Sequence, residues 1–154
     1  MSDIAENGDH PYRLIYFSRI RPETLADMDG AMRDILHASL RFNRRADVTG
    51  ALLACGGYFL QALEGPRAGV DEIFGRIKRD RRHEEVQVVG AGPMPQRQFA
   101  NWSMCASQFS VRDAAIVKIL ATKKRFDLRS LTEANALSLL KVVSDLHSEA
   151  PSSM

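Results

Sequence analysis

Two short runs of β-forming residues flank a pair of glycines near the middle of the chain. The runs cover residues 50–55 and 58–64, and the pair between them is Gly56-Gly57. Consecutive glycines accept the positive φ angles of a two-residue hairpin turn and let the flanking strands pair directly. The sequence therefore predicts an antiparallel hairpin, which commits this part of the chain to a β-sheet.

Segments on both sides of this hairpin extend the sheet and supply helices to cover it. Residues 12–19 are largely apolar on both faces, as in an interior strand, and residues 86–89 and 101–106 favour two more strands. Apolar residues at helical spacing predict amphipathic helices at 22–40 and at about 70–80. This order indicates an α+β, ferredoxin-like β-α-β-β-α-β fold with a five-stranded mixed sheet and both helices on one face.

Two C-terminal segments with helical periodicity are expected to cover the other face of the sheet. They span residues 112–122 and 130–148. Ser130-Leu131-Thr132-Glu133 fits the capping box, in which the first and fourth side chains satisfy free backbone N–H groups. We therefore predict that the longer helix begins at this motif.

The length of 154 residues is typical of one domain with a small appendage. Apolar residues make up 45% and charged residues 26%, which excludes a wholly disordered or fibrous chain. We divide the chain into a disordered N-terminal tail at 1–9, a folded domain at 10–107, a C-terminal helical cap or output segment at 108–149 and a tail at 150–154.

Charge, hydropathy and cysteine content argue against several kinds of partner and site. A formal charge of +2 is too small to indicate a nucleic-acid partner. No apolar run approaches the roughly 20 residues that cross a bilayer. Cys55 and Cys105 form no CxxC pair, so neither a metal site nor a disulfide scaffold is favoured. We expect a cytoplasmic protein with no membrane partner.

Polar residues in the predicted core are the first sign of chemistry. The chain has no P-loop, dinucleotide-binding glycine motif, HExxH zinc motif or GxSxG elbow. Instead, Tyr16, Asn43 and Gln61 lie where the pattern predicts apolar side chains. An unpaired buried amide costs about 1–3 kcal/mol, so each needs a partner. Either the three side chains satisfy one another and the backbone, or another polar group lies among them.

These residues belong to a series of motifs between residues 12 and 107. The series consists of LIYFS, RFNRRADVTGALL, YFLQALEG, RDRRH and FANWSM. In content, order and spacing it resembles the BLUF family, the blue-light sensors that use a flavin. Phe42 departs from the polar residue that some members have, and we expect it to pack rather than to bind. The resemblance implies that a flavin is the missing polar partner.

The resemblance also implies roles for the polar core residues. The isoalloxazine ring of FAD would lie between the two helices on one face of the sheet, although FMN or riboflavin could fill the same ring site. Tyr16 would be the electron and proton donor. Gln61 would lie between the Tyr16 hydroxyl and the N5/O4 edge of the flavin, and Asn43 would bind the O4/N3 edge.

Five further residues receive expected roles from the same resemblance. Arg82 would reach the O2 side of the ring, and His83 would lie beside the ring. The basic run from Arg76 to Arg82 would otherwise be a solvated helix end. Trp102 or Met104 would relay the change through the last strand. Ser18 would belong to the cofactor-binding residues and is a candidate partner of the indole.

The expected mechanism follows from the donors and acceptors of these groups. Flavin C4=O and N5 accept hydrogen bonds and N3–H donates one, so amides with both capacities suit this edge. The excited flavin would take an electron from Tyr16, and the proton would follow through Gln61. After recombination, Gln61 would stay rotated or tautomerised, and the absorption would move to the red.

We expect a non-enzymatic photoreceptor that regulates a separate signalling protein. About 47 residues follow residue 107, too few for a typical catalytic domain. The signal would leave through the C-terminal helices or the sheet face, from a homo-oligomer that is a dimer or a larger ring. Two other classes stay open on the residues alone: a ferredoxin-like module that binds a small molecule or RNA, and a small flavin oxidoreductase.

Overall fold

The computed structural model describes residues 10–55, 57–105 and 132–149. The strands are β1 (Tyr12–Ile20), β2 (Thr49–Cys55), β3 (Tyr58–Gly65), β4 (His83–Pro93) and β5 (Trp102–Cys105). The helices are α2 (Pro22–Leu25), α3 (Met28–Ala38), α4 (Arg67–Lys78) and α6 (Glu133–Glu149), with a short π-helix, η1 (Ser39–Asn43), directly after α3.

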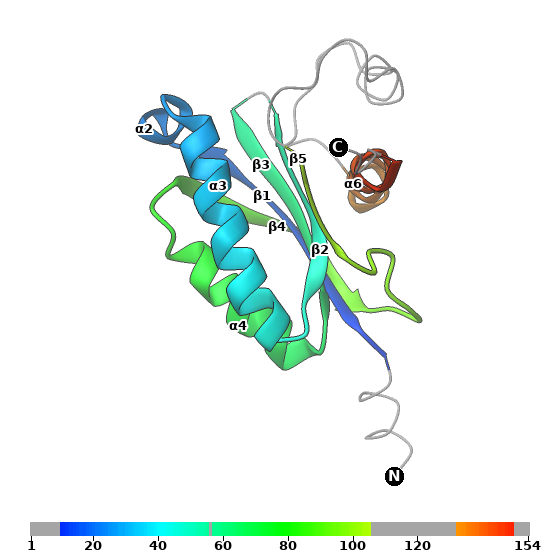
Figure 1. The fold of residues 1–154 in the computed structure, drawn as a ribbon. Helices are drawn as coiled ribbons and strands as arrows, with labels where there is room; N and C mark the ends of the chain where they lie inside the picture. Colours follow the sequence, from blue (N-terminus) through cyan, green and yellow to red (C-terminus); the bar gives the residue numbers. More distant parts are fainter. Residues whose placement is uncertain (1–9, 56, 106–131, 150–154) are drawn as a thin grey trace.

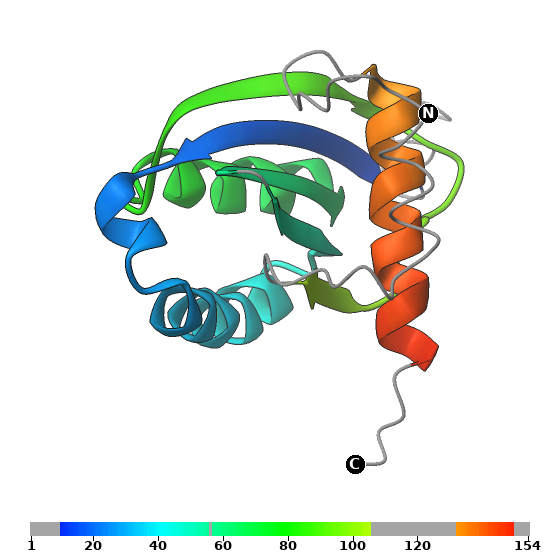
Figure 2. The ribbon, with the colours of Figure 1, turned by 90° about the horizontal axis from the view of Figure 1, so that it is seen from above.

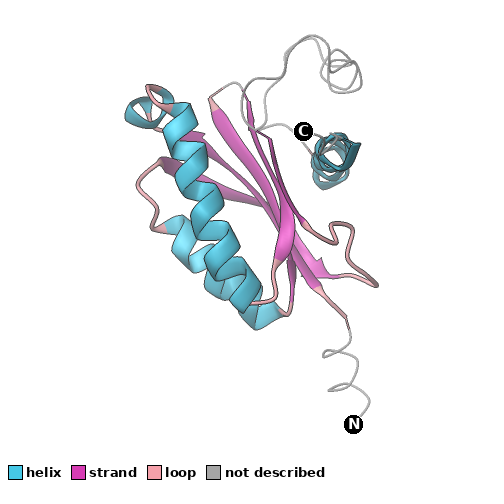
Figure 3. Ribbon diagram, viewed as in Figure 1, coloured by secondary structure: helices cyan, strands magenta, loops and turns pink. Residues whose placement is uncertain are grey.

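The strands form one sheet in the order β4-β1-β3-β2-β5. Neighbours are antiparallel from β4 to β2, and β5 joins β2 in parallel. Helices α3 and α4 cover one face of the sheet, and α6 lies against the other (Figures 1 and 3). The predicted α+β class is therefore confirmed, and the central strands β1 and β3 are buried between two helical layers.

The predicted hairpin at the central glycines is confirmed. Strands β2 and β3 pair along their whole length. Gly57 in the turn has a φ of +85°, which residues with a side chain rarely adopt. The register places Gln61 of β3 between Tyr16 of β1 and Leu52 of β2, so the two polar core residues are direct neighbours.

Strand β4 is longer than the strand predicted at 86–89. It pairs with β1 from His83 to Pro93, with two register irregularities, and Glu85 has a φ of +56°. Backbone hydrogen bonds to β1 hold this edge strand extended although its side chains do not alternate regularly between buried and exposed. Gly90 and Gly92, near the C-terminal end of β4, therefore belong to the strand although glycine is typical of loops.

The single helix predicted at 22–40 is wrong, because the chain forms two helices and a π-helical turn here. Helix α2 ends at Leu25, and the Asp27 carboxylate accepts the Gly30 N–H at 3.1 Å, which caps α3. A side chain that satisfies a free N–H starts a new helix even where apolar spacing runs on. The following turn η1 ends at Asn43 and buries its side chain.

Helix α6 begins three residues later than predicted. The Thr132 hydroxyl accepts the Asn135 N–H at 3.1 Å and so caps the helix, whereas Ser130 lies outside the described residues. Among the described ranges, no helix is long and apolar enough to cross a membrane. The helix predicted at 112–122 and both predicted tails lie outside the described residues.

Candidate functional site

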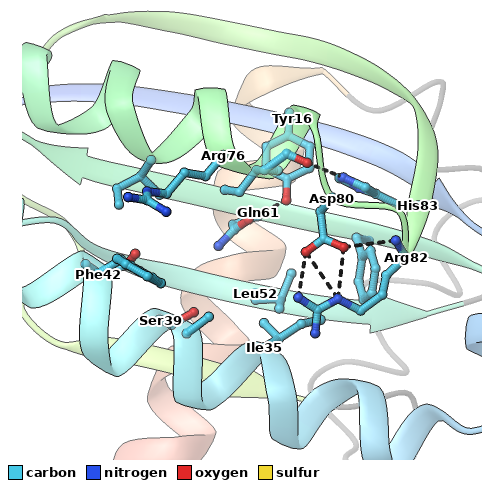
Figure 4. Close-up of a pocket in the computed structure, with 15 residues that line it drawn as sticks. Tyr16, Ile35, Ser39, Phe42, Leu52, Gln61, Arg76, Asp80, Arg82 and His83 are labelled. Atoms are coloured by element: carbon cyan, nitrogen blue, oxygen red, sulfur yellow. Dashed lines mark hydrogen bonds and ion pairs between the residues drawn. The ribbon is translucent and has the colours of Figure 1, made fainter.

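A cavity of about 150 Å³ lies between the sheet and the helical layer of α3 and α4 (Figure 4). Its lining comes from the sheet (Tyr16, Leu52, Phe59, Gln61), from α3 and η1 (Ile35, Ala38, Ser39, Phe42, Asn43), and from α4 and the residues after it (Ile73, Arg76, Ile77, Asp80, Arg82, His83). The cavity thus brings together five of the six residues predicted to bind a cofactor. Ser18 is not among its lining residues.

The floor of the cavity carries a hydrogen bond between Tyr16 and Gln61. The Tyr16 hydroxyl donates to Gln61 Oε1, and both side chains are almost fully buried. Figure 4 shows the amide nitrogen of Gln61 turned away from Tyr16, toward the cavity. Gln61 therefore offers its donor group to a ligand while its acceptor is held by the phenol.

Burial keeps the Tyr16 phenol neutral. Loss of solvation raises the pKa of Tyr16 well above its ordinary value, and the nearby negative charge of Asp80 raises it further. The phenoxide is thus disfavoured in the folded protein. Tyr16 enters any reaction in this cavity as a protonated phenol whose hydroxyl hydrogen faces an amide oxygen.

The raised pKa predicts an alkaline titration in which Tyr16 stays silent. At about pH 10.5, above the ordinary phenol pKa of about 10, folded wild type and Tyr16→Phe should show the same tyrosinate absorbance. The native state keeps a proton that the unfolded chain loses, so the free energy of unfolding should fall as pH rises above about 10. One extra tyrosinate in the folded wild type would contradict this prediction.

Asn43 has a buried hydrogen-bond donor beside the cavity. Its side chain is 5% exposed, and Nδ2 is buried without a hydrogen-bond partner among the described residues. An orphaned buried donor costs about 1–3 kcal/mol, which a carbonyl oxygen in the cavity would offset. Tyr16 and Gln61 therefore satisfy each other in part, but neither they nor the other described residues accept the hydrogen bond that Asn43 Nδ2 can donate.

Arg82 lines the cavity but is held by a neighbouring carboxylate. Its Nε and Nη2 donate to Asp80 at 2.9 and 2.6 Å, and Nη1 lies 3.5 Å from the Ala31 carbonyl (Figure 4). Burial would raise the pKa of Asp80, but the hydrogen bonds from Arg82 outweigh it and hold the pKa below its usual value. Asp80 thus orients the Arg82 guanidinium, and the expected contact of Arg82 with a ring oxygen stays a prediction.

His83 has both ring nitrogens bonded to the protein. Nε2 lies 2.6 Å from the Ile77 carbonyl, which can only accept, so Nε2 carries the proton. Nδ1 then accepts the Ser18 hydroxyl at 2.6 Å. The His83 ring packs edge-on to Tyr16, at 6.2 Å between centroids. In this structure Ser18 thus bonds to His83, and the expected pairing of Ser18 with an indole stays a prediction, because the Trp102 side chain lies outside the described part of the chain.

The predicted relay residues lie on β5. In the parallel pairing with β2, Met104 stands beside Leu52, and Trp102 stands beside Gly50. Leu52 lines the cavity, so the β5 backbone is one strand removed from it. The side chains of Trp102 and Met104 lie outside the described part of the chain.

Several residues that line the cavity are not among the site residues predicted from the sequence. Ile35 and Ser39 precede Asn43 at four-residue spacing, which places all three on one helical face and could have revealed them. Arg76 was assigned to a solvated helix end, but it lines the cavity and its guanidinium lies 4.0 Å from the centre of the Phe42 ring. Phe42 thus packs, as predicted, against a cation at the cavity.

Comparison with known families identifies the same segment of the chain. The family model for sensors of blue light using FAD (BLUF) matches residues 12–105. The photoactivated adenylate cyclase subunit beta of Euglena gracilis is 33% identical over 96 residues, which are 61% of this chain and 11% of that protein. The blue light- and temperature-regulated antirepressor BluF of Escherichia coli (strain K12) is 34% identical over 91 residues, 59% of this chain and 22% of that protein.

Solved structures show the same arrangement over most of the chain. The dark-state structure of the BLUF protein BlrB has a TM-score of 0.70 at 31% identity and covers 90% of this chain and 98% of its own. The photo-activated state of BlsA has a TM-score of 0.73 at 26% identity and covers 86% and 94%. The chain spans only about a tenth of the Euglena cyclase subunit, so the likeness to that protein concerns one of its parts.

Proposed function

This chain belongs to the family of sensors of blue light using FAD, and from that premise we propose that light switches the hydrogen bond between Tyr16 and Gln61. The observation that carries this proposal is the buried pair beside an orphaned amide donor on Asn43. FAD is the chromophore of the family. A flavin edge supplies the carbonyl acceptors that these amide donors lack.

The residues around the cavity suit a flat aromatic ring with one polar edge. Ile35, Leu52 and Ile73 offer apolar surface, and Asn43 and Gln61 offer amide donors. Arg82, held by Asp80, adds positive charge without a free carboxylate that would repel a ring oxygen. We assign Asn43, Gln61 and Arg82 to the polar edge of the ring, with Tyr16 and His83 beside it.

Tyr16 and Gln61 supply the electron and the proton path. When bound, the flavin absorbs blue light and in its excited state accepts an electron from a nearby donor. Tyr16 is a neutral, oxidisable phenol, and its hydroxyl proton already points at Gln61 Oε1. As Tyr16 gives up its electron, this proton moves onto the Gln61 amide. When the electron returns to Tyr16, the Gln61 amide gives a proton back to the phenol oxygen. A proton returned from Oε1 leaves Gln61 as a rotated amide, and one returned from Nε2 leaves it as the tautomer.

The changed Gln61 is the lit state. A rotated or tautomerised amide presents a different donor and acceptor pattern to the cavity, while the residues and the chromophore keep their composition. A stronger hydrogen bond to the ring carbonyl moves the absorption to longer wavelength. Such a state needs no substrate and leaves no product, as expected of a sensor rather than an enzyme.

Removal of the Asn43 amide should weaken FAD binding. The Asn43→Ala variant loses a buried donor, and we expect the dissociation constant of FAD to rise about 5- to 150-fold, which corresponds to about 1–3 kcal/mol. Fluorescence titration of the apoprotein measures this constant. Asn135→Ala, on the exposed face of α6, is the matched control. Equal FAD affinity in the two variants would remove Asn43 from the site.

We further propose that the signal passes to a separate protein through α6 or the face of the sheet beneath it. Supporting this, α6 packs against the strands that carry Tyr16 and Gln61, on the face opposite the cavity. Two relatives are named as a cyclase and an antirepressor, which are different outputs. A light switch whose output surface can contact different partners accommodates both.

Absorption spectroscopy of the purified protein tests the proposed function. We expect a yellow protein whose spectrum shifts reversibly to the red under blue light, without oxidation of added NAD(P)H. Accumulation of reduced flavin with NAD(P)H and no red shift would instead identify a flavin oxidoreductase. Chromatography of the released cofactor checks that it is FAD.

A further inference from the structure

The N-terminal end of α6 lies against the face of the sheet opposite α3 and α4 (Figure 2). Its Glu133 side chain makes a polar contact with Arg13 on that face. Apolar side chains hold the middle of the helix, where Ala136, Leu139 and Leu140 pack with buried residues of β1, β2 and β3. Apolar burial is non-directional, so it does not by itself fix the position of the helix along the sheet. The polar contacts of Glu133 can do so.

The Glu133 carboxylate lies against two strands of the sheet, β1 and β4. Its Oε2 lies 3.5 Å from Nη2 of Arg13 on β1, and the Arg13 side chain is only 15% exposed. On β4, Gly90 leaves room for the same carboxylate, because a methyl group there would lie 2.8 Å from Glu133 Oε2. A side chain at position 90 would therefore displace Glu133 from its place beside Arg13.

Glu64 connects Arg13 to the strand that carries Gln61. The Glu64 side chain is wholly buried, and its Oε2 lies 4.0 Å from Arg13 Nη1. Residues 61 and 64 are an odd number of positions apart on β3, so their side chains project from opposite faces of the sheet. Strand β3 thus presents an amide to the cavity and a carboxylate to the side of α6.

The same carboxylate holds the segment between β4 and β5 beneath α6. The backbone N–H groups of Gln98 and Phe99 each donate to Glu64 Oε1 at 2.8 Å. The Phe99 side chain is buried in the cluster that contains the apolar residues of α6. Lys141 on α6 donates to the Gln98 carbonyl at 3.2 Å. Glu64 is therefore linked to α6 twice, through Arg13 and through this segment.

We propose that Arg13, Glu64 and Gly90 form an α6 docking site, through which a change at Gln61 reaches α6. In the dark, Glu133 pairs with Arg13 over Gly90. A displacement of β3 at Gln61 moves Glu64 and with it Arg13 and the segment under the helix, which weakens the docking. This transmission rests on the light switch proposed above, whereas the docking in the dark does not.

Hydrogen exchange of the FAD-loaded protein in the dark tests the docking site, with Gly90→Ala as the test variant. Because the added methyl moves the Glu133 carboxylate away from Arg13, we expect amides 137–141 to exchange about three- to fivefold faster than in wild type, as for the loss of a partly exposed ion pair. Gly92→Ala, on the same strand, is the matched control, since a methyl group at position 92 meets no atom within 4 Å. In Gly92→Ala, the exchange rates of amides 137–141 should stay within about twofold of those in wild type. Equal exchange in the two variants would overturn the docking site.

A double variant separates the contact with Glu133 from a general effect on β4. In a Glu133→Ala background the added methyl has no carboxylate to meet. We therefore expect Gly90→Ala to leave exchange of amides 137–141 unchanged there, which is a non-additive result typical of residues in contact. An equal acceleration by Gly90→Ala in both backgrounds would show that the methyl acts elsewhere and would overturn the assignment of Gly90.

Blue light tests the transmission on the same samples. We expect faster exchange of amides 137–141 in lit wild type, and a smaller light-to-dark ratio in Gly90→Ala, with the red shift intact in both. A normal red shift without any light effect on these amides would overturn the transmission and leave the photoreceptor standing. A wild type without a red shift would overturn the proposed function, and the dark comparison would still decide the docking site.

Discussion

The Gln61→Leu variant is expected to bind FAD and to show no light-induced red shift. Leucine keeps the volume of the side chain but removes both the acceptor of the Tyr16 hydrogen bond and the donor turned toward the cavity. The proton of Tyr16 then has no amide to enter, and no side chain can rotate or tautomerise. The absorption spectrum before and after blue light measures the result.

Matched variants distinguish loss of the switch from loss of the fold. Gln61→Leu leaves the buried Tyr16 hydroxyl unpaired, so we expect the free energy of unfolding to fall by about 1–3 kcal/mol without loss of structure. Gln87→Leu, at an exposed position of β4, should keep the full red shift. A full red shift in Gln61→Leu would refute the role of this amide.

Tyr16→Phe, which changes the other residue of the hydrogen bond with Gln61, is also expected to abolish the red shift. Phenylalanine fills the same place against Phe74 but has no hydroxyl proton and is a poor electron donor. FAD should remain bound, because the amides of Asn43 and Gln61 are still present. We expect illumination to produce no lasting spectral change, which absorption spectroscopy checks at the same protein and light dose as wild type.

Tyr58→Phe serves as the control for this substitution. Tyr58 lies on β3 and packs edge-on to Phe17 at 6.3 Å, on the face away from the cavity. It should keep the red shift of wild type. If Tyr16→Phe also kept it, the electron and proton would have to come from another residue, and the assignment of Tyr16 as donor would be wrong.

The arrangement of the switch in the sheet could be predicted because local patterns agree with the fold. The glycine pair fixes the hairpin, and the apolar run at 12–19 requires a strand covered on both faces. Pairing these two elements brings Tyr16 and Gln61 together. The motif series then added a flavin, and the orphaned amide of Asn43 agrees with that expectation.

Contacts between distant or competing groups could not be read from periodicity. The break before α3 depends on whether Asp27 caps a helix or stays in solvent. The pairing of Ser18 with His83 depends on how β1 and β4 are aligned across an irregular register. The orientation of Arg82 depends on Asp80, the acidic residue within an otherwise basic run. Each outcome is decided by tertiary placement.

The arrangement of the sheet also disfavours the rival classes. An RNA-binding sheet needs aromatic side chains on an open face, but α3 and α4 cover one face here and α6 packs on the other (Figure 2). The aromatic residues of the sheet that line the cavity, Tyr16 and Phe59, are buried. The polar groups that line the cavity include the amides of Asn43 and Gln61 and the internally paired Asp80–Arg82, which suit a bound ring better than a nucleic acid backbone.

Infrared spectroscopy can ask directly whether light changes the bond between Tyr16 and Gln61. The chain has three tyrosines, so Tyr12→Phe/Tyr58→Phe leaves Tyr16 alone, and ring-deuterated tyrosine then marks its bands. We predict a light-minus-dark spectrum with a shifted Tyr16 C–O band that appears and decays with the red shift. A red shift with no difference signal from labelled Tyr16 would contradict the proposed switch.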